Sequence, residues 1–250
     1  MLVHCEKHNL NYEKKPFEMI GFSFLTQCPE CVKERKEKME QEEKEERRIA
    51  LAEQKEIERL ERFKRLNIEQ EFYNATFGNY IAETESQKKA KWAVQELVRG
   101  NLQKVILLGE NGVGKSHLGN VAVNETDGLI MTAYEIGVYI RGGVATGKEH
   151  ERLEYLSSVS LLVVDEMGRT KMSEAERYWH SYIFDKRHVR GLRSMVLSNH
   201  HYRRDCRLGG CPKCFETLLD DDSISRFMQR GYTLTVQGKD YRRKNGTTIY

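Results

Sequence analysis

The chain has 250 residues, and its 41 Lys and Arg against 38 Asp and Glu leave a formal net charge of only +3. This length accommodates one α/β core and a small additional module, and the charge balance excludes nucleic-acid binding through the overall field of the protein, so any such contact needs a local basic patch. Since no apolar run approaches membrane-spanning length and the first residues lack the apolar segment of a signal peptide, we expect a cytoplasmic protein without membrane contact.

The first 31 residues contain two short pairs of metal-binding residue types, a CxxH pair and a CPEC pair. Two such pairs separated by a loop are typical of a tetrahedral zinc site, and a module of about 30 residues needs such a metal to be stable. We predict a Zn2+-binding module over residues 1–31, with His4 as an alternative to Cys5 or His8 and free thiols as the alternative interpretation. The predicted ligands are Cys5, His8, Cys28 and Cys31.

The next segment, residues 32–71, is strongly charged, contains no Gly or Pro and is almost free of apolar residues before Ile49. This composition predicts a long solvated helix that links the zinc-binding module to the core. The second half of the segment has a partial apolar stripe, which suffices for docking but does not continue as heptads and consists of Leu51, Ile57, Leu60, Phe63 and Leu66. We interpret the segment as a helical spacer, and a coiled-coil or partner-binding helix is the alternative.

Residues 72–250 are expected to form the core domain, which begins with FYNATFGNY at residues 72–80. The aromatic side chains of this stretch are candidates for the wall of an adenine pocket. A helix is expected to follow and to contain residues 88–98.

Residues 109–116 read GENGVGKS, which fits the phosphate-binding pattern GxxxxGK[ST] at every specified position. An apolar stretch at residues 104–108 predicts a buried strand before this loop, and residues 117–123 predict a helix whose N-terminus faces the anion. In this pattern the glycines turn backbone N–H groups toward the phosphates, the lysine reaches the β and γ oxygens and the serine ligates Mg2+. We predict that ATP or GTP binds to Gly109, Glu110, Asn111, Gly112, Val113, Gly114, Lys115, Ser116 and His117.

A second carboxylate-bearing strand follows the loop. Residues 161–166 read LLVVDE, with four apolar residues before Asp165 and Glu166. Because ligands bind at the carboxyl ends of parallel strands, we expect Asp165 to hold Mg2+ through water and Glu166 to act as the general base that activates the attacking water. Residues 128–136 and 193–199 are further strand candidates. This alternation of strands and helices predicts an α/β fold with a parallel sheet covered by helices on both faces.

A second group of metal-binding residue types lies in a Cys-rich insertion at residues 200–214. It contains the sequence CPKC and a third cysteine, so it offers three thiols and two candidate histidines. Either a second Zn2+ is bound, with the fourth ligand left open, or the segment is a surface insertion with reduced cysteines. The candidate ligands are Cys206, Cys211, Cys214 and His201, with His200 as the alternative histidine.

The order of the segments TFGNY, GENGVGKSHL, LLVVDEMG, MVLSNH, SISRFMQRG and KDYR resembles the AAA+ replicative helicase loaders of the DnaC and DnaI type, and the related IstB-type transposition helpers are close by. The resemblance covers roughly residues 62–243. It implies an AAA+ ATPase in which Asn199 orients the attacking water, Arg226 is a finger for the γ-phosphate of a neighbouring subunit, and Arg242 is a second sensor. Arg230 and Arg243 are the alternatives to these two arginines. The Cys-rich insertion departs from these loaders, which usually have a short connection there.

The resemblance also implies partners: a hexameric replicative helicase of the DnaB type, single-stranded DNA and further copies of this chain. A zinc-bearing N-terminal domain is similar to that of DnaI-type loaders, where it contacts the helicase, so we assign helicase docking to residues 1–31 and the charged helix. Arg141, Lys148 and Arg152, in a glycine-containing stretch, are candidates for contacts with single-stranded DNA, against an ordinary surface loop. The rival functions are a transposition helper that binds duplex DNA and a nucleotide-binding adaptor with little turnover.

Overall fold

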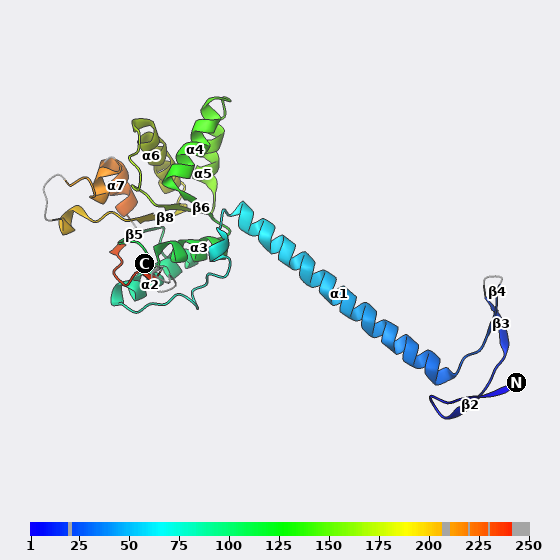
Figure 1. Ribbon diagram of the computed structural model, residues 1–250. Helices are drawn as coiled ribbons and strands as arrows, with labels where there is room; N and C mark the ends of the chain where they lie inside the picture. The colour runs from blue at the N-terminus through cyan, green and yellow to red at the C-terminus, as the bar shows by residue number, and fades with distance from the viewer. Residues whose placement is uncertain (20–21, 207–210, 220, 230, 242–250) are drawn as a thin grey trace, which may run out of the picture. The chain divides into compact units, whose positions relative to one another are not determined.

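The computed structural model describes residues 1–19, 22–206, 211–219, 221–229 and 231–241. The chain divides into two compact units, Met1–Leu60 and Glu61–Tyr250 (Figure 1). The boundary between them falls inside the long helix α1, Pro29–Arg65.

Two short antiparallel hairpins precede α1 in the first unit. The first pairs β1 with β2, and the second pairs β3 with β4. An isolated two-stranded hairpin is only marginally stable in water, so these hairpins require a further constraint such as a bound metal. The sequence patterns did not predict the four strands, which cover Leu2–Cys5, Leu10–Glu13, Pro16–Met19 and Phe22–Leu25.

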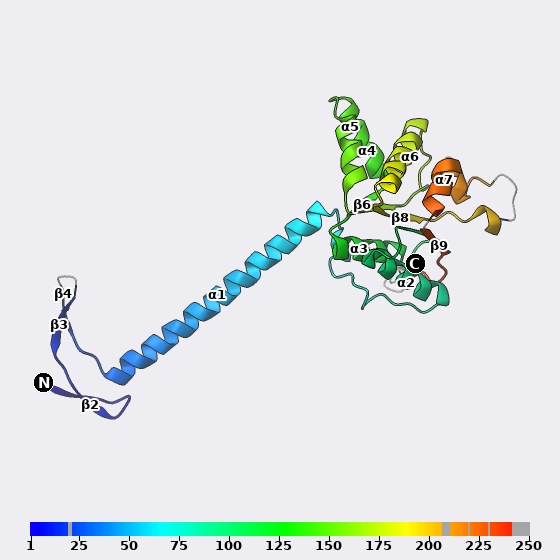
Figure 2. The same cartoon turned by 180° about the vertical axis from the view of Figure 1, so that it is seen from behind.

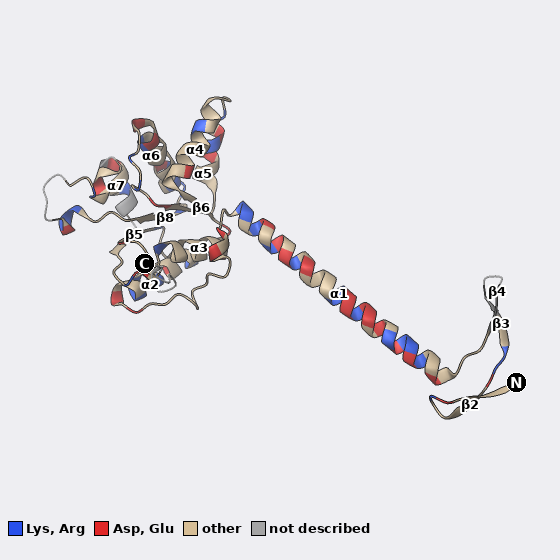
Figure 3. Cartoon of the chain, viewed as in Figure 1, with Lys and Arg blue, Asp and Glu red and all other residues tan. Residues whose placement is uncertain are grey.

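Helix α1 begins with a proline, whose missing N–H costs nothing in the first turn of a helix. Positively and negatively charged residues are interspersed along it (Figure 3), and some of them pair, such as Lys38 with Glu42 at 3.6 Å. Such exposed pairs each stabilise a helix by only about 0.3–0.5 kcal/mol. The helix ends at Arg65 and not at residue 71 as expected, because Asn67 adopts a left-handed backbone with φ of 57° and donates its side-chain amide to Ile130 O at 2.8 Å.

The second unit contains a five-stranded parallel sheet in the order β6-β7-β8-β5-β9. Helices α2 and α3 cover one face of this sheet, and α4, α5, α6 and α7 lie on the other face (Figures 1 and 2). The strands are β5 Lys104–Leu108, β6 Leu129–Thr132, β7 Leu161–Asp165, β8 Arg193–Ser198 and β9 Gly231–Thr235. The helices are α2 Glu85–Arg99, α3 Lys115–Thr126, α4 Ala133–Val144, α5 Glu149–Ser158, α6 Glu174–Val189 and α7 Asp221–Met228, and single 3-10 turns cover Gln70–Phe72, Arg203–Asp205 and Phe215–Thr217.

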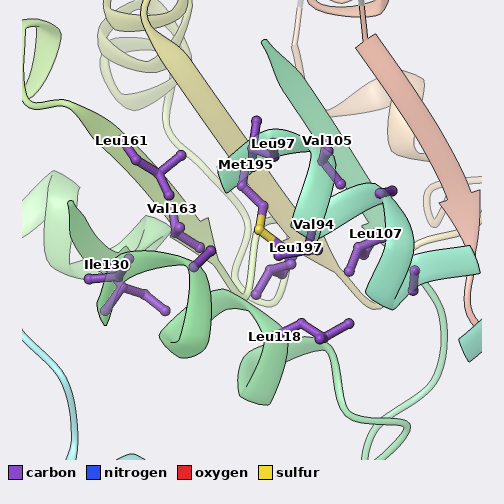
Figure 4. Close-up of a cluster of buried hydrophobic side chains, with 14 of the residues drawn as sticks. Val94, Leu97, Val105, Leu107, Leu118, Ile130, Leu161, Val163, Met195 and Leu197 are labelled. Carbon is purple, nitrogen blue, oxygen red and sulfur yellow. The ribbon is translucent and has the colours of Figure 1, made fainter. Parts of the chain in front are cut away.

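The central strands are buried on both faces, which explains their continuous apolar sequences. Along β5, Val105 and Leu107 face the layer of α2 and α3, whereas Ile106 and Leu108 belong to the core on the opposite face. Figure 4 shows the first of these two cores, where side chains of α2 and α3 meet those of the sheet. Because β5, β7 and β8 are parallel neighbours, their carboxyl ends lie at the same edge of the sheet, and α3 begins at this edge.

The structure confirms the α/β fold with a helix-covered parallel sheet, and strands lie at residues 104–108, 161–165 and 193–198 as expected. The strand expected over residues 128–136 is wrong in its second half. There Thr132 ends β6 and caps α4, because its side chain accepts a hydrogen bond from Glu135 N at 3.1 Å. The sequence patterns also missed β9.

Candidate functional site

The glycine-rich loop joins β5 to α3 and depends on glycine at three positions with positive φ. Gly109, Gly112 and Gly114 have φ values of 141°, 77° and 96°. A Cβ atom on Gly109 would lie 2.2 Å from Val236 O, and one on Gly114 would lie 2.7 Å from Tyr80. The loop therefore adopts the backbone that phosphate binding requires, at the N-terminus of α3 where the helix dipole favours an anion.

Lys115, the first residue of α3, is buried at the centre of the loop, with 7% of its surface exposed. Its Nζ donates hydrogen bonds to Gly109 O at 2.8 Å, Glu110 O at 2.7 Å and Asn199 Oδ1 at 2.9 Å. These neutral oxygens hold the ammonium where the β and γ phosphate oxygens of a nucleotide would bind. A ligand phosphate can replace them as a charged acceptor.

Asp165, the last residue of β7, lies beside Ser116, whose hydroxyl donates a hydrogen bond to its carboxylate. Burial raises the pKa of Asp165 above its usual value, although the hydrogen bonds from Ser116 and from Glu166 N oppose this shift. A buried carboxylate beside a serine hydroxyl suits a divalent cation, because the cation compensates the cost of desolvating the charge. The two predicted Mg2+ ligands are thus adjacent in space.

Glu166, the predicted general base, follows Asp165 with a left-handed backbone, φ of 52°. This conformation is uncommon for a residue other than glycine and occurs often at active sites. The carboxylate of Glu166 pairs with Arg169.

A cavity of about 340 Å3 surrounds these groups, within the usual range for ligand pockets. Phe72, Tyr80 and Ile81 line it, so the FYNATFGNY segment contributes to its wall as expected. The cavity joins this partly apolar region to the charged region around Lys115 and Asp165. This combination suits a nucleotide, with the base near the aromatic side chains and the phosphates at the loop.

The C-terminal segment 236–241 also borders the nucleotide loop, which the sequence analysis did not foresee. Tyr241 N donates to Gly112 O at 3.1 Å, and a Cβ atom on Gly112 would lie 1.7 Å from Asp240 Oδ1. Tyr241 lines the cavity. The only sequence signal was the KDYR motif, because contacts over more than 120 residues leave no local pattern.

Asn199 lies directly after β8 and contacts the loop twice. Its Oδ1 accepts from Lys115, and its Nδ2 donates to Asn111 Oδ1 at 2.7 Å. Arg226 lies on α7, where it pairs with Asp185 of α6 at 2.9 Å, and it is not among the described residues that line the cavity. The predicted second sensor Arg242 and the alternative arginines Arg230 and Arg243 lie outside the described residues.

The basic stretch considered for single-stranded DNA forms the end of α4, a turn and the start of α5. Arg141 pairs with Glu176 at 2.5 Å. Arg152 donates to Tyr139 O and stacks over the Tyr139 ring at 4.8 Å. Two of the three basic side chains are therefore engaged within the chain, and Lys148 is exposed.

In the first unit, the structure brings together the four predicted zinc ligands, each with one ligand atom within 4.8 Å of the others. Measured separations include 3.6 Å from Cys5 Sγ to His8 Nδ1, 3.3 Å from Cys31 Sγ to His8 Nδ1 and 3.8 Å from Cys28 Sγ to His8 Nδ1. Zinc bonds of about 2.0–2.3 Å in a tetrahedron separate ligand atoms by about 3.3–3.8 Å, so the cluster could hold this ion.

The contacts of His4 and Glu34 show which histidine belongs to this cluster and how its ring is oriented. His4 lies outside it, because its Nδ1 lies 2.7 Å from Asn11 Oδ1. The other ring nitrogen of His8 lies 2.9 Å from Glu34 Oε1, an arrangement of carboxylate, histidine and metal that orients the ring in many zinc sites. The hydrogen bond with His8 lowers the pKa of Cys5 to about 6, whereas burial raises the pKa of Cys31 to about 11.

The second group of predicted ligands also comes together, and it consists of His201, Cys206, Cys211 and Cys214.

Within the described part of the chain, no helix is both long and apolar enough to cross a membrane.

Comparison with known proteins agrees with this geometry. The sequence pattern of the IstB-like ATP binding proteins matches residues 31–248. The replicative helicase loader DnaC of Escherichia coli (strain K12) is 29% identical over 189 residues, which cover 72% of this chain and 77% of that protein. DnaC of Buchnera aphidicola subsp. Baizongia pistaciae (strain Bp) is 30% identical over 192 residues, covering 72% and 74%. A crystal structure of the DnaC helicase loader has the same fold, with a TM-score of 0.57 at 19% identity, over 68% of this chain and 100% of that one.

Proposed function

Because this chain belongs to the family of IstB-like ATP-binding proteins, which are AAA+ ATPases, we propose that it is a loader that binds a hexameric replicative helicase of the DnaB type and helps deliver it to single-stranded DNA. The observation that carries the proposal is the similarity to DnaC loaders over 72% of the chain. The cavity that gathers Lys115, Asp165 and Asn199 supports the ATP-dependent part.

In the proposed reaction, Lys115 binds the β and γ phosphate oxygens of ATP, and Ser116 and Asp165 hold Mg2+, which when bound neutralises charge on the phosphates. Glu166 leaves Arg169 and accepts a proton from the attacking water, and Asn199 orients that water. The close contacts of Lys115 with Asn199 and of Ser116 with Asp165 support these assignments.

Hydrolysis is proposed to depend on assembly of several copies. Arg226 lies on α7 away from the residues of its own cavity, which suits a side chain that acts on the γ-phosphate of a neighbouring copy. Arg242 is proposed as the second sensor within the same chain. A single copy is therefore expected to hydrolyse ATP slowly.

The N-terminal module is proposed to bind Zn2+ through Cys5, His8, Cys28 and Cys31 and to dock on the helicase together with α1. The family pattern begins at residue 31, so the two hairpins and most of these ligands lie outside the part shared with the family. A region that is added to a common ATPase core is a reasonable place for partner specificity. Contacts with single-stranded DNA are proposed for exposed basic side chains such as Lys148. We also propose that the protein is cytoplasmic.

Two measurements on the full chain test the proposal. Capture of a DnaB-type hexamer on the immobilised protein tests partner binding, and ATP turnover with the helicase and single-stranded DNA tests the switch. We expect capture of the helicase, turnover that requires both partners, and loss of turnover but not of capture in Lys115→Ala. Stimulation by duplex DNA without helicase capture would support a transposition helper, and absence of turnover under all conditions would support an adaptor.

The docking role of the N-terminal module is tested by Cys28→Ser/Cys31→Ser. This variant should lose helicase capture while it still binds a fluorescent ATP analogue, because the ligands lie outside the nucleotide cavity. Retention of helicase capture by this variant, with its zinc lost, would refute the assignment of docking to the module.

A further inference from the structure

A second cluster of metal-binding side chains lies between β8 and α7, inside the ATPase unit. His201 Nε2 lies 3.6 Å from Cys211 Sγ and 3.7 Å from Cys214 Sγ. With Cys206, each of these residues offers one ligand atom within 4.8 Å of the others. The two distances from His201 Nε2 lie within the about 3.3–3.8 Å between ligand atoms around a tetrahedral zinc ion with bonds of about 2.0–2.3 Å.

The backbone selects His201 over His200 as the fourth ligand. His201 and Cys214 form an isolated parallel β-bridge, and Phe215 N donates to His201 O at 2.8 Å. This bridge holds the two ligands together independently of their side chains. His200 has other contacts, since its Nδ1 lies 3.3 Å from Ser198 Oγ.

The cysteines are arranged for a metal better than for a disulfide. Cys214 N donates to Cys211 O at 3.3 Å, so the CPKC sequence forms a turn that brings both thiols to one side. Cys214 is buried, with 2% of its surface exposed. A disulfide would use two of the three cysteines and leave the third and the histidine unused, whereas Zn2+ uses all four groups.

We propose that His201, Cys206, Cys211 and Cys214 bind a Zn2+ ion, separate from the N-terminal site, that holds the segment between Asn199 and the helix carrying Arg226. Zinc binding itself is independent of the loader function. Only the consequence for ATP hydrolysis rests on the proposed function.

The segment is anchored on both sides of the metal, which explains how the ion would affect hydrolysis. On one side Asn199, two residues before His201, contacts Lys115. On the other side Phe215 and Leu218 are buried in the core under α6, and α7 follows. The ion would link these two anchors through His201 and Cys214, so its loss should weaken the connection between Asn199 and α7.

The glycine-rich loop and Lys115 belong to β5 and α3, which lie outside this segment. Loss of the second zinc should therefore leave nucleotide binding nearly unchanged. It should lower the kcat for ATP hydrolysis by up to about 100-fold, because misplacing a positioning group by about an ångström can cost that much.

The first test is the zinc content of the full chain, measured by release with a thiol reagent and a metal-sensitive dye. The wild type should release two ions per chain, Cys211→Ser/Cys214→Ser one ion, and the matched control His200→Ala two ions. Release of a single ion by the wild type, or an unchanged count in Cys211→Ser/Cys214→Ser, would overturn the proposal.

A second measurement keeps the test valid if Cys211→Ser/Cys214→Ser does not fold. In the full chain carrying Cys28→Ser/Cys31→Ser, which leaves the ATPase unit intact, added Co2+ should give the thiolate and d–d absorption bands of a tetrahedral cysteine site. Absence of these bands in protein that still binds a fluorescent ATP analogue would overturn the site. Neither readout depends on the helicase, so failure of the loader function would appear separately, as loss of helicase capture.

Discussion

Replacement of Arg226 by alanine separates a catalytic role of this side chain from its structural role. Its ion pair with Asp185 is 2.9 Å long, and the two side chains are 49% and 37% exposed. A pair with that exposure contributes about 0.2–1 kcal/mol to the free energy of unfolding. An arginine that acts on the γ-phosphate in trans contributes at least about 10³-fold to kcat, which corresponds to about 4 kcal/mol. The catalytic effect should therefore be several times larger than the structural one.

The assay is steady-state ATP hydrolysis by the full chain with helicase and single-stranded DNA, with thermal unfolding measured in parallel. Arg226→Ala should lower kcat at least about 10³-fold and lower the unfolding temperature by no more than about 2–4 °C. Asp185→Asn is the matched control, because it breaks the same ion pair but keeps the arginine, and it should retain activity.

Mixing two inactive variants tests the action in trans. A Lys115→Ala subunit binds no nucleotide but still offers Arg226, so it should restore hydrolysis at the intact nucleotide site of an Arg226→Ala neighbour. The reasoning is refuted if Asp185→Asn loses as much activity as Arg226→Ala, or if the mixture stays inactive although its subunits co-assemble.

Three further substitutions test the site and the core. Asp165→Asn should abolish Mg2+-dependent hydrolysis but raise the unfolding temperature of the protein without nucleotide at pH 7. Burial raises the pKa of Asp165, so its ionised form is costly in the folded state. The gain in unfolding temperature should shrink as the pH falls through that pKa, and a gain that stays constant with pH would contradict this reasoning. Arg187→Met should lower the free energy of unfolding in urea by about 1–3 kcal/mol, because Ser194 Oγ and three backbone carbonyls lose the donor that the fully buried guanidinium supplies, and an unchanged or higher stability would contradict this. Gly109→Ala should prevent binding of a fluorescent ATP analogue, because its Cβ would clash with Val236 O, and wild-type affinity would show that the loop tolerates a side chain.

The sequence was informative where structure depends on residues close together in the chain. The buried strands at residues 104–108 and 161–165 are continuous apolar runs because helices cover both faces of the sheet. The carboxyl ends of β5, β7 and β8 then meet at one edge, so the positions of Lys115 and Asp165 could be foreseen from the loop pattern and the strand ends. Asn199 was expected only from the resemblance to the helicase loaders. The CxxH and CPEC pairs are local signals of the same kind.

The remaining features depend on contacts between distant segments. Strand β9 has a mixed polar sequence, and only its pairing with β5 makes it a strand. The choice of His201 over His200 required the bridge to Cys214, 13 residues away. The early end of α1 depends on Asn67, whose side chain binds the carbonyl of Ile130. None of these contacts has a periodic pattern in the sequence.

The hydrogen bonds of Lys115 connect the nucleotide loop with the segment that leads to Arg226. The Lys115 ammonium donates a hydrogen bond to Asn199 Oδ1. A phosphate that accepts this hydrogen bond instead would release the Asn199 side chain. A charged acceptor forms the stronger hydrogen bond, so this exchange favours the nucleotide. Asn199 lies two residues before His201, and the segment from His201 leads through the buried Phe215 to α7. Under the proposed function, ATP binding would therefore act on the same segment that the proposed second zinc would hold, and a chain without that ion should bind ATP but fail to transmit the change to Arg226.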